Sequence, residues 1–310
     1  MEVRVEFPEG IRCVVALSYD LEMCAGYSPV SVNHGRIMAP VQDYALSLCQ
    51  TAEDFGVQLH FFHVGNGLEE EDVGYLQEIL RRGHVVDSHT YSHIRLATPD
   101  FHKLDAELAL TNHLLEQRLD CQSTVLRGPG GEPDGLHGLE DNQRAILKNG
   151  FRWVTCHMDV TMGQDGLDYD AAAPSRLTAY AYPTGLIELP IQGWMDRGYF
   201  DSFRCVDQEA YDQWRAESGH KPVPDGWQCP WTDEDALDGW IEYNLAALDF
   251  AYDNKLLWVP TWHPYSHYLH DPENRALPAL LEHARSKPET VHVGTVRDAV
   301  KMLRTNSKAS

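Results

Sequence analysis

The segment Gly83–Leu96, GHVVDSHTYSHIRL, ends a short β-branched run with two histidines, His89 and His93. The run 85–87 predicts a short buried strand, so both histidines follow its C-terminal end, where α/β folds place their chemistry. A spacing of four residues predicts one face of a helical turn, close enough for both imidazoles to bind one metal ion. The chain contains 16 histidines, so the pair alone does not establish a metal site.

Strand and helix patterns alternate on both sides of this segment. Apolar runs predict strands at 12–19, 57–64, 85–87, 124–127, 150–158, 185–190, 256–260 and 291–295. Amphipathic periodicity predicts helices at 39–55, 70–82, 104–119, 142–149, 233–253, 276–285 and from 296 onward. Such repeated alternation predicts a parallel sheet with outer helices, either an open doubly wound sheet or a closed barrel.

An aromatic- and proline-rich stretch interrupts the alternation at about 163–231. It has no clear period, so we expect an insertion over one face of a single domain that spans 1–305. The insertion either narrows a pocket or makes a contact between subunits of a homo-oligomer. The tail, 306–310, is expected to be disordered.

Charge and cysteine usage restrict the partners and the compartment. The chain contains 25 Lys and Arg residues and 47 Asp and Glu residues. Its net charge of −22 argues against nucleic acid or an anionic membrane as partner. No run of about 18 apolar residues predicts a membrane span, and the N-terminus lacks the pattern of a secretory signal. The seven cysteines are scattered without a CxxC, which predicts reduced thiols and a cytoplasmic protein.

Residues that carry chemistry gather at the predicted strand ends. Asp20 and Glu22 close the first strand region, Arg127 begins the turn RGPGG, and His263 follows the strand at 256–260. Asp196 follows the strand at 185–190. A carboxylate with two imidazoles is a common catalytic ligand set that leaves a coordination position open for water.

Ordinary structural roles stand beside these functional ones. Arg127 would then form a surface ion pair, Asp196 would be a solvated loop charge, and His263 would be a buried histidine bonded to a carbonyl group. His60 and His63 lie three apart on a predicted strand and are expected to pack. The HExxH and His-x-His signatures of other metallohydrolases are missing from the sequence.

The order of these motifs resembles the polysaccharide deacetylase family, also called the NodB-homology or carbohydrate esterase 4 fold. The resemblance rests on the acidic cluster, SHTYSH at 88–93, Arg127 before Gly-Pro, and the late Trp-His-Pro at 262–264. It covers the chain from about Ala16 to the last helix. It implies a distorted (β/α) barrel with parallel strands and outer helices, and a metal-dependent hydrolase of C–N bonds.

The acidic motif departs from the family pattern of threonine, phenylalanine and two aspartates, in which the first aspartate is the base and the second a ligand. This chain reads SYDLE at 18–22, and Leu21 cannot bind a metal. A branch that resembles intracellular peptidoglycan deacetylase-like and allantoinase-like proteins uses an acid two residues after the first. Glu22 fits that position, so the resemblance implies Glu22 as ligand, with Asp20 as the alternative ligand.

The same resemblance implies the metal centre and the base. Glu22, His89 and His93 would bind a divalent metal, Zn²⁺ before Co²⁺, Ni²⁺ or Fe²⁺, that polarises the substrate carbonyl and activates water. Asp20 would take the proton of that water. Arg127 would hold the Asp20 carboxylate and set its basicity.

The resemblance also implies the acid and the substrate contacts. His263 would protonate the leaving nitrogen, and Asp196 would keep His263 cationic. Trp194, Trp262 and Tyr265 are candidate rings for stacking on a substrate, with packing in the core or in an interface as the alternative.

Two reactions remain open, the removal of an N-acyl group from an amino sugar and the opening of a cyclic amide or imide. A cytoplasmic protein favours a small molecule or an oligosaccharide over a cell-wall polymer, and the negative charge disfavours a strongly anionic substrate. A non-catalytic barrel that binds a metal or ligand is the alternative from another class, supported by the missing second aspartate. A metal-free hydrolase is the third hypothesis.

Overall fold

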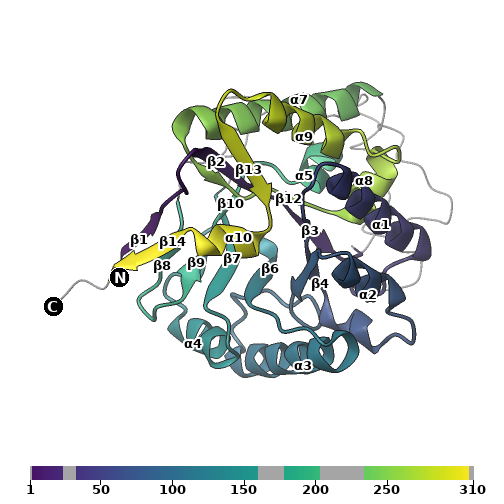
Figure 1. Ribbon diagram of the computed structural model, residues 1–310. Coiled ribbons are helices and arrows are strands. Elements are labelled where there is room, and N and C mark those ends of the chain that lie inside the picture. The colour runs from purple at the N-terminus through teal and green to yellow at the C-terminus, as the bar shows by residue number, and fades with distance from the viewer. Residues whose placement is uncertain (1, 24–32, 160–177, 203–233, 307–310) are drawn as a thin grey trace.

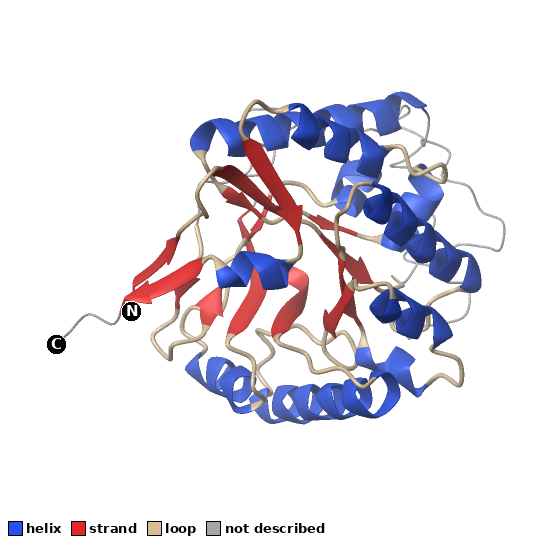
Figure 2. Cartoon of the chain, viewed as in Figure 1, coloured by secondary structure: helices blue, strands red, loops and turns tan. Residues whose placement is uncertain are grey.

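The computed structural model describes residues 2–23, 33–159, 178–202 and 234–306 (Figure 1). A curled and mostly parallel sheet forms the centre, and helices cover its outside (Figure 2). In the view of Figure 1, α7 (Glu234–Asn254) and α9 (Ala276–Ser286) lie at the top, and α3 (Phe101–Leu119) and α4 (Glu140–Lys148) lie at the bottom. The expected α/β barrel with parallel strands and outer helices is therefore confirmed in its distorted, curled form.

The central sheet has the strand order β12-β3-β4-β5-β6-β7-β9-β8, with β10 paired to β7. All its neighbours are parallel except β8 and β9. Parallel strands buried on both faces require near-continuous apolar runs, which explains the runs in the sequence. The strands are β3 (Ser18–Leu21), β4 (His60–His63), β5 (Val85–Ser88), β6 (Val125–Glu132), β7 (Trp153–Asp159), β8 (Tyr180–Ala181), β9 (Ile187–Glu188), β10 (Ile191–Gln192) and β12 (Thr261–Trp262).

A second, three-stranded sheet continues the first around the barrel. It contains β2 (Ile11–Ala16), β11 (Leu257–Trp258) and β13 (Thr290–Gly294). The strand predicted at 12–19 is divided at Leu17, whose N–H donates to Gly294 O (3.0 Å). On the other side, the Gln192 N–H donates to Val259 O (3.2 Å). β10 therefore lies against the β11–β12 segment, and the curled sheet comes back towards its own first strands.

The outer helices follow the predicted amphipathic pattern. α1 (Ala39–Asp54) begins with proline in its first turn and buries one face, formed by Val41, Tyr44, Ala45, Leu48, Cys49 and Ala52. α10 (Val296–Lys301) begins with a capping box between Thr295 and Asp298. The others are η1 (Gly65–Glu69), α2 (Gly74–Arg81), α3 (Phe101–Leu119), α4 (Glu140–Lys148), α5 (Asp196–Ser202), α7 (Glu234–Asn254), α8 (Pro264–His270) and α9 (Ala276–Ser286).

Some sequence predictions need correction or lie outside the described residues. The sequence did not predict α5, α8 or the antiparallel pair of β1 (Glu2–Val5) with β14 (Leu303–Asn306). Asn306, placed in the tail at 306–310, pairs with Glu2; 307–310 lie outside the described residues. Most of the insertion at about 163–231 also lies outside them, and its described part, 178–202, contains β8–β10 and α5.

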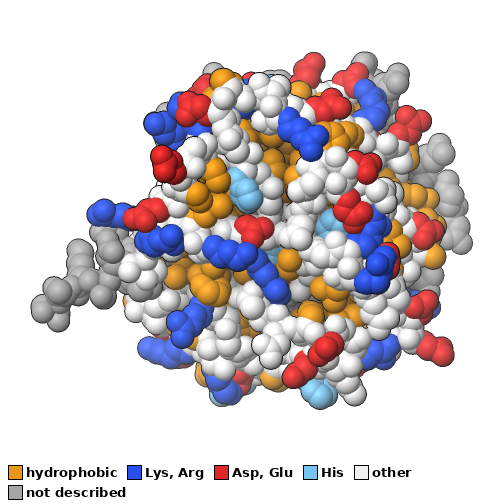
Figure 3. All heavy atoms as spheres, viewed as in Figure 1, with side chains coloured by type: hydrophobic (Ala, Val, Ile, Leu, Met, Phe, Trp, Pro, Cys, Tyr) orange, Lys and Arg blue, Asp and Glu red, His pale blue; other side chains and the backbone are white. Residues whose placement is uncertain are grey.

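The described surface mixes charges of both signs. On the face in Figure 3, acidic and basic side chains alternate with hydrophobic and uncharged ones. Among the described residues, Leu110 is the one large hydrophobic side chain classed as exposed. None of the described helices is long and apolar enough to cross a membrane.

A buried carboxylate ties the sheet to the last helix. Asp87 in β5 is fully buried, and Arg297 in α10 donates two hydrogen bonds of 2.8 Å to its carboxylate. His60 Nε2 lies 3.0 Å from the same carboxylate, and the Thr124 N–H donates to it (2.7 Å). Burial alone would raise the pKa of Asp87, but the hydrogen bonds from Arg297 and His60 lower it below its ordinary value.

We expect Arg297→Met to lower the free energy of unfolding at pH 7 by about 2–3 kcal/mol, because Asp87 stays buried without its cation. A lowered folded-state pKa stabilises the fold above the unfolded pKa of about 4, and this contribution is lost as the pH falls below it. The difference in free energy of unfolding between wild type and Arg297→Met should therefore become smaller at acid pH. Urea unfolding at pH 7 and near pH 3.5 measures it; an equal difference at both pH values would contradict this account.

Arg144→Gln is the control for this substitution. Arg144 pairs with Asp141 on the surface, at 3.1 Å, with both side chains about two-thirds exposed. Removal of such a pair should change the free energy of unfolding by less than about 1 kcal/mol at either pH.

Candidate active site

The loop after β5 carries the two histidines but is not helical, which corrects the helical turn predicted from their spacing. Thr90 and His93 have positive φ values of 61° and 63°. Its backbone groups bond to neighbouring segments: Gly65 N–H donates to Thr90 O (2.8 Å), and His89 N–H donates to His63 O (3.0 Å). These contacts replace the i to i+4 pattern of a helix. Left-handed backbone at residues other than glycine is uncommon and tends to occur at functional sites.

Glu22, His89 and His93 come together at the ends of β3 and β5. One ligand atom from each lies within 4.8 Å of the others, the single such group found among the described residues. Glu22 Oε2 is 3.2 Å from His89 Nε2 and also contacts His93 Nε2. Glu22 and His89 are almost fully buried, whereas His93 is partly exposed.

The hydrogen bonding of His89 tests whether this group fits a cation. His89 Nδ1 lies 3.1 Å from Arg127 O, and a carbonyl oxygen only accepts, so Nδ1 carries the proton. The lone pair of Nε2 then faces Glu22 Oε2, which is also an acceptor. Two acceptors at this distance need a proton or a metal ion between them. The donor set and the bonded Nδ1 therefore fit a divalent metal.

The charge state of Glu22 agrees with that fit. Burial alone would raise its pKa, but the imidazoles of His89 and His93 against its carboxylate lower the pKa well below its ordinary value. An ionised carboxylate is the form that binds a metal. Beside it, His34 stacks on His93 with ring centroids 4.3 Å apart.

Asp20 lies on the same face of the chain as Glu22, two residues before it, as the alternation of a strand requires. It is 4% exposed, and its Oδ2 is 3.8 Å from His89 Nε2. Arg127 Nη1 is 3.6 Å from Asp20 Oδ1, so the two form an ion pair through a single long contact. Asp20 therefore stands beside the histidines but farther from them than Glu22.

Hydroxyl groups hold the buried guanidinium of Arg127. Its Nη2 donates to Ser18 Oγ (2.6 Å), its Nη1 donates to Thr261 Oγ1, and its guanidinium lies 4.7 Å from the centre of the Phe62 ring. The surface ion pair considered for Arg127 is excluded, because this side chain is fully buried. Arg127 thus joins β3, β6 and β12 beneath the acidic pair.

His263 and Asp196 meet on the other side of Glu22. His263 Nδ1 donates to Asp196 Oδ1 (2.7 Å), and His263 Nε2 is 3.8 Å from Glu22 Oε1. Asp196 is fully buried, which excludes the solvated loop charge. Burial by itself lowers the pKa of His263, but the carboxylate of Asp196, together with those of Glu22 and Asp20, outweighs this effect and raises the pKa to about 9. His263 is therefore a cation near neutral pH.

The three candidate stacking rings differ in burial. Trp262 and Tyr265 are 0% and 1% exposed, which favours the packing alternative, because a buried ring has no face for a substrate. Trp194 is partly buried, and its backbone N–H donates to Tyr243 OH (2.7 Å). Among the three, only Trp194 keeps exposed surface.

Sequence reasoning missed several neighbours of the site. Ser18 and Thr261, which hold Arg127, are adjacent to predicted residues, and the two-residue period from Ser18 to Asp20 was a usable signal. His34 and His267 have no motif that sets them apart from the other histidines. His60 and His63 are fully buried, as expected.

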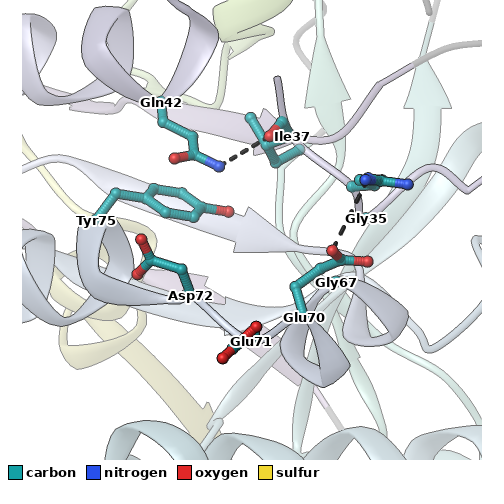
Figure 4. A pocket seen from close by; sticks show the side chains of 9 residues that line it. Gly35, Ile37, Gln42, Gly67, Glu70, Glu71, Asp72 and Tyr75 are labelled. Atoms are coloured by element: carbon teal, nitrogen blue, oxygen red, sulfur yellow. Dashed lines mark hydrogen bonds and ion pairs between the residues drawn. The ribbon is translucent and has the colours of Figure 1, made fainter. Parts of the chain in front are cut away.

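A separate hollow of about 270 Å³ lies near the site (Figure 4). Tyr75 lies along it, and the Tyr75 hydroxyl is 2.8 Å from His63 Nε2. The carbonyl oxygen of His63 in turn accepts a hydrogen bond from the His89 N–H. Of the site residues described above, none lines this hollow. Its lining consists of Gly35, Arg36, Ile37, Gln42, Gly67, Glu70, Glu71, Asp72 and Tyr75.

Fold and geometry together define a curled (β/α) barrel with a carboxylate and histidine cluster at the C-terminal ends of its strands. Residues 30–148 match the polysaccharide deacetylase family, which confirms the resemblance seen in the sequence. The matched segment contains His89, His93 and Arg127, whereas the two acids and His263 lie outside it. No curated protein matches this sequence.

Solved structures share this fold. A putative polysaccharide deacetylase from Mycobacterium smegmatis is 20% identical, with a TM-score of 0.64 over 99% of this chain and 97% of that chain. A probable polysaccharide deacetylase from Pseudomonas aeruginosa PAO1 is 13% identical, with a TM-score of 0.60 over 96% and 92%. Puue allantoinase is 14% identical, with a TM-score of 0.58 over 96% and 91%. At these identities the likeness concerns the fold.

Proposed function

We propose that this protein is a metal-dependent hydrolase that cleaves a C–N bond of an amide, in the manner of a deacetylase. The observation that carries the proposal is the cluster of Glu22, His89 and His93, with an acid on one side and a cationic histidine on the other. The match of 30–148 to the polysaccharide deacetylase family supports the same reaction class.

In this proposal Glu22, His89 and His93 bind the metal, preferably Zn²⁺, with Co²⁺, Ni²⁺ or Fe²⁺ as alternatives. A metal bound there supplies Lewis acidity, which polarises a carbonyl group and makes water more acidic. The protonated Nδ1 of His89, fixed by Arg127 O, keeps Nε2 turned towards Glu22.

The protein's own residues would then move the protons. Asp20 accepts the proton of the attacking water, and the guanidinium of Arg127, 3.6 Å from Asp20 Oδ1, holds the side chain in place. His263 donates its Nε2 proton to the leaving nitrogen, so that the amine departs without a negative charge. Asp196 keeps His263 cationic and oriented through the 2.7 Å hydrogen bond.

The same residues would also open a cyclic amide or imide, because that reaction needs the same attacking water and the same acid. The fold shared with an allantoinase, and the acid two residues after Asp20, make this reaction the second candidate. The substrate in either case is proposed to be a small molecule or an oligosaccharide, of which an amino sugar is the first candidate.

We further propose a cytoplasmic, homo-oligomeric protein. The free thiols of Cys13, Cys49, Cys121 and Cys156 are compatible with a reducing compartment. Much of the segment from which the subunit contact was inferred, about 163–231, lies outside the described residues. Sedimentation equilibrium measures the oligomeric state.

A substrate panel tests the reaction. N-acetyl amino sugars, chitooligosaccharides, hydantoins, imides and allantoin are incubated with the Zn²⁺-loaded protein, and released acetate, amine or ring-opened product is measured. We expect turnover of amides in one of the two classes, and Asp20→Asn should lower it by about 10²–10⁴-fold. If a substrate is turned over equally well by Asp20→Asn, the proposed base is wrong.

A further inference from the structure

Asp196 lies between two histidines that are one helical turn apart. Its Oδ1 accepts from His263 Nδ1 (2.7 Å), and its Oδ2 accepts from the His263 backbone N–H (2.8 Å). The same Oδ2 faces His267 Nε2 at 3.5 Å. Asp196 begins α5 and His267 lies in α8, which packs against α5 (Figure 1). The carboxylate thus joins the acid of the proposed mechanism to a second imidazole.

The surroundings of His267 are aromatic. Its ring stacks on Trp262 with centroids 4.8 Å apart, and the rings of Tyr19 and Trp240 meet it edge-on at 6.2 Å. A phenylalanine ring would make stacking and edge-on contacts of the same kind. Packing therefore does not explain why an imidazole stands here.

Burial makes the imidazole costly at this position. His267 is 0% exposed, and neither of its ring nitrogens has a hydrogen-bond partner at good geometry in the described parts of the chain. Buried polar groups without partners destabilise a fold. Among the described residues, Asp196 provides the one carboxylate contact of a His267 ring nitrogen, with Oδ2 3.5 Å from Nε2. Burial also lowers its pKa, so the ring is neutral near neutral pH and carries a single N–H.

We propose that His267 is a positioning residue for His263: its Nε2–H faces Asp196 Oδ2 and holds the carboxylate in the orientation that fixes the His263 ring. This inference rests on the proposed function, in which His263 acts as the acid. His267 does not touch substrate, because it is fully buried behind Trp262. Its loss should therefore lower kcat and leave KM nearly unchanged.

The steady-state test compares three variants. His267→Phe keeps the ring shape without the N–H, and we expect kcat to fall about tenfold with KM within about twofold of wild type. His267→Gln places an amide N–H near the former Nε2 and should restore most of kcat. His270→Phe is the matched control. His270 is a buried histidine of the same helix, stacked on Phe200 at 4.3 Å, and its ring nitrogens also lack partners among the described residues.

A spectroscopic readout is independent of turnover. The His263 Nδ1 proton is buried in a short hydrogen bond, so its resonance should lie far downfield and exchange slowly with water. It is assigned by its loss in His263→Gln. We expect faster exchange in His267→Phe, and wild-type exchange in His267→Gln and His270→Phe.

These outcomes separate the inference from the proposed function. Wild-type kcat and wild-type proton exchange in His267→Phe would overturn the inference, even where His263→Gln has lost activity. Faster exchange in His267→Phe, in a protein that hydrolyses no amide, would support the positioning contact and overturn the proposed function. Where His267→Phe does not fold, His267→Asn takes its place. Its shorter amide does not reach Oδ2, so it should lose the slow exchange that His267→Gln keeps.

Discussion

His89→Ala, His93→Ala and Glu22→Gln are each expected to lose the metal, whereas Asp20→Asn keeps it. Glu22 Oε2 contacts Nε2 of both histidines, whereas Asp20 Oδ2 is 3.8 Å from His89 Nε2 and makes no ion-pair contact with His93 among the described residues. Loss of one of three protein ligands should weaken Zn²⁺ binding by more than about 100-fold. Competition with a chromogenic chelator measures the affinity.

This comparison also decides between the two acids. A protein that binds Zn²⁺ normally as Glu22→Gln and loses it as Asp20→Asn would reverse their roles. His113→Ala is the control, because His113 is exposed on α3 and away from the cluster in sequence and element. It should bind the metal like the wild type.

His263→Gln is expected to keep the metal and to lose about 10²–10⁴-fold in kcat. His263 Nε2 lies 3.8 Å from Glu22 Oε1, near enough to serve a substrate at the cluster, and its raised pKa of about 9 supplies a proton at neutral pH. Pre-steady-state release of the amine product, with the metal content measured in the same sample, tests the prediction. A wild-type rate in His263→Gln would remove His263 from the mechanism.

Asp196→Asn provides a pH-dependent companion to that variant. Asp196 raises the pKa of His263, and the acid form is present below this pKa and lost as the pH rises through about 9. Without the carboxylate the pKa of His263 falls. The alkaline limb of kcat should therefore move to lower pH in Asp196→Asn, and an unmoved limb would contradict the role of Asp196.

The hydrophobic pattern of the sequence predicted the barrel. Its strands are buried on both faces and therefore appear as continuous apolar runs, and its helices are buried on one face and therefore appear as amphipathic segments. The runs at 57–64 and 85–87 became β4 and β5, and the helix at 39–55 became α1. β1, β14 and α5 are short and show little hydrophobic periodicity, and their positions depend on contacts with distant segments. Sequence pattern alone could not place them.

The sequence could indicate only those parts of the candidate site that depend on where the strands end. Glu22 follows β3 and His89 follows β5, the two strands that flank β4, so the parallel topology places both residues at the same edge of the sheet. The positive φ of His93 could not be predicted, because it depends on tertiary bonds of its loop. Nor could the burial of Trp262 be read from a Trp-His-Pro motif, since the packing of α7 and α8 over β12 decides it.

The central claim, a metal-dependent hydrolase centred on Glu22, His89 and His93, is tested most directly by titrating metal-free protein with Zn²⁺ while amide hydrolysis is followed. We expect no turnover in the metal-free protein and a linear rise in the rate of hydrolysis to a plateau at about one equivalent of Zn²⁺. Full turnover in protein holding less than about a tenth of an equivalent of metal would contradict it.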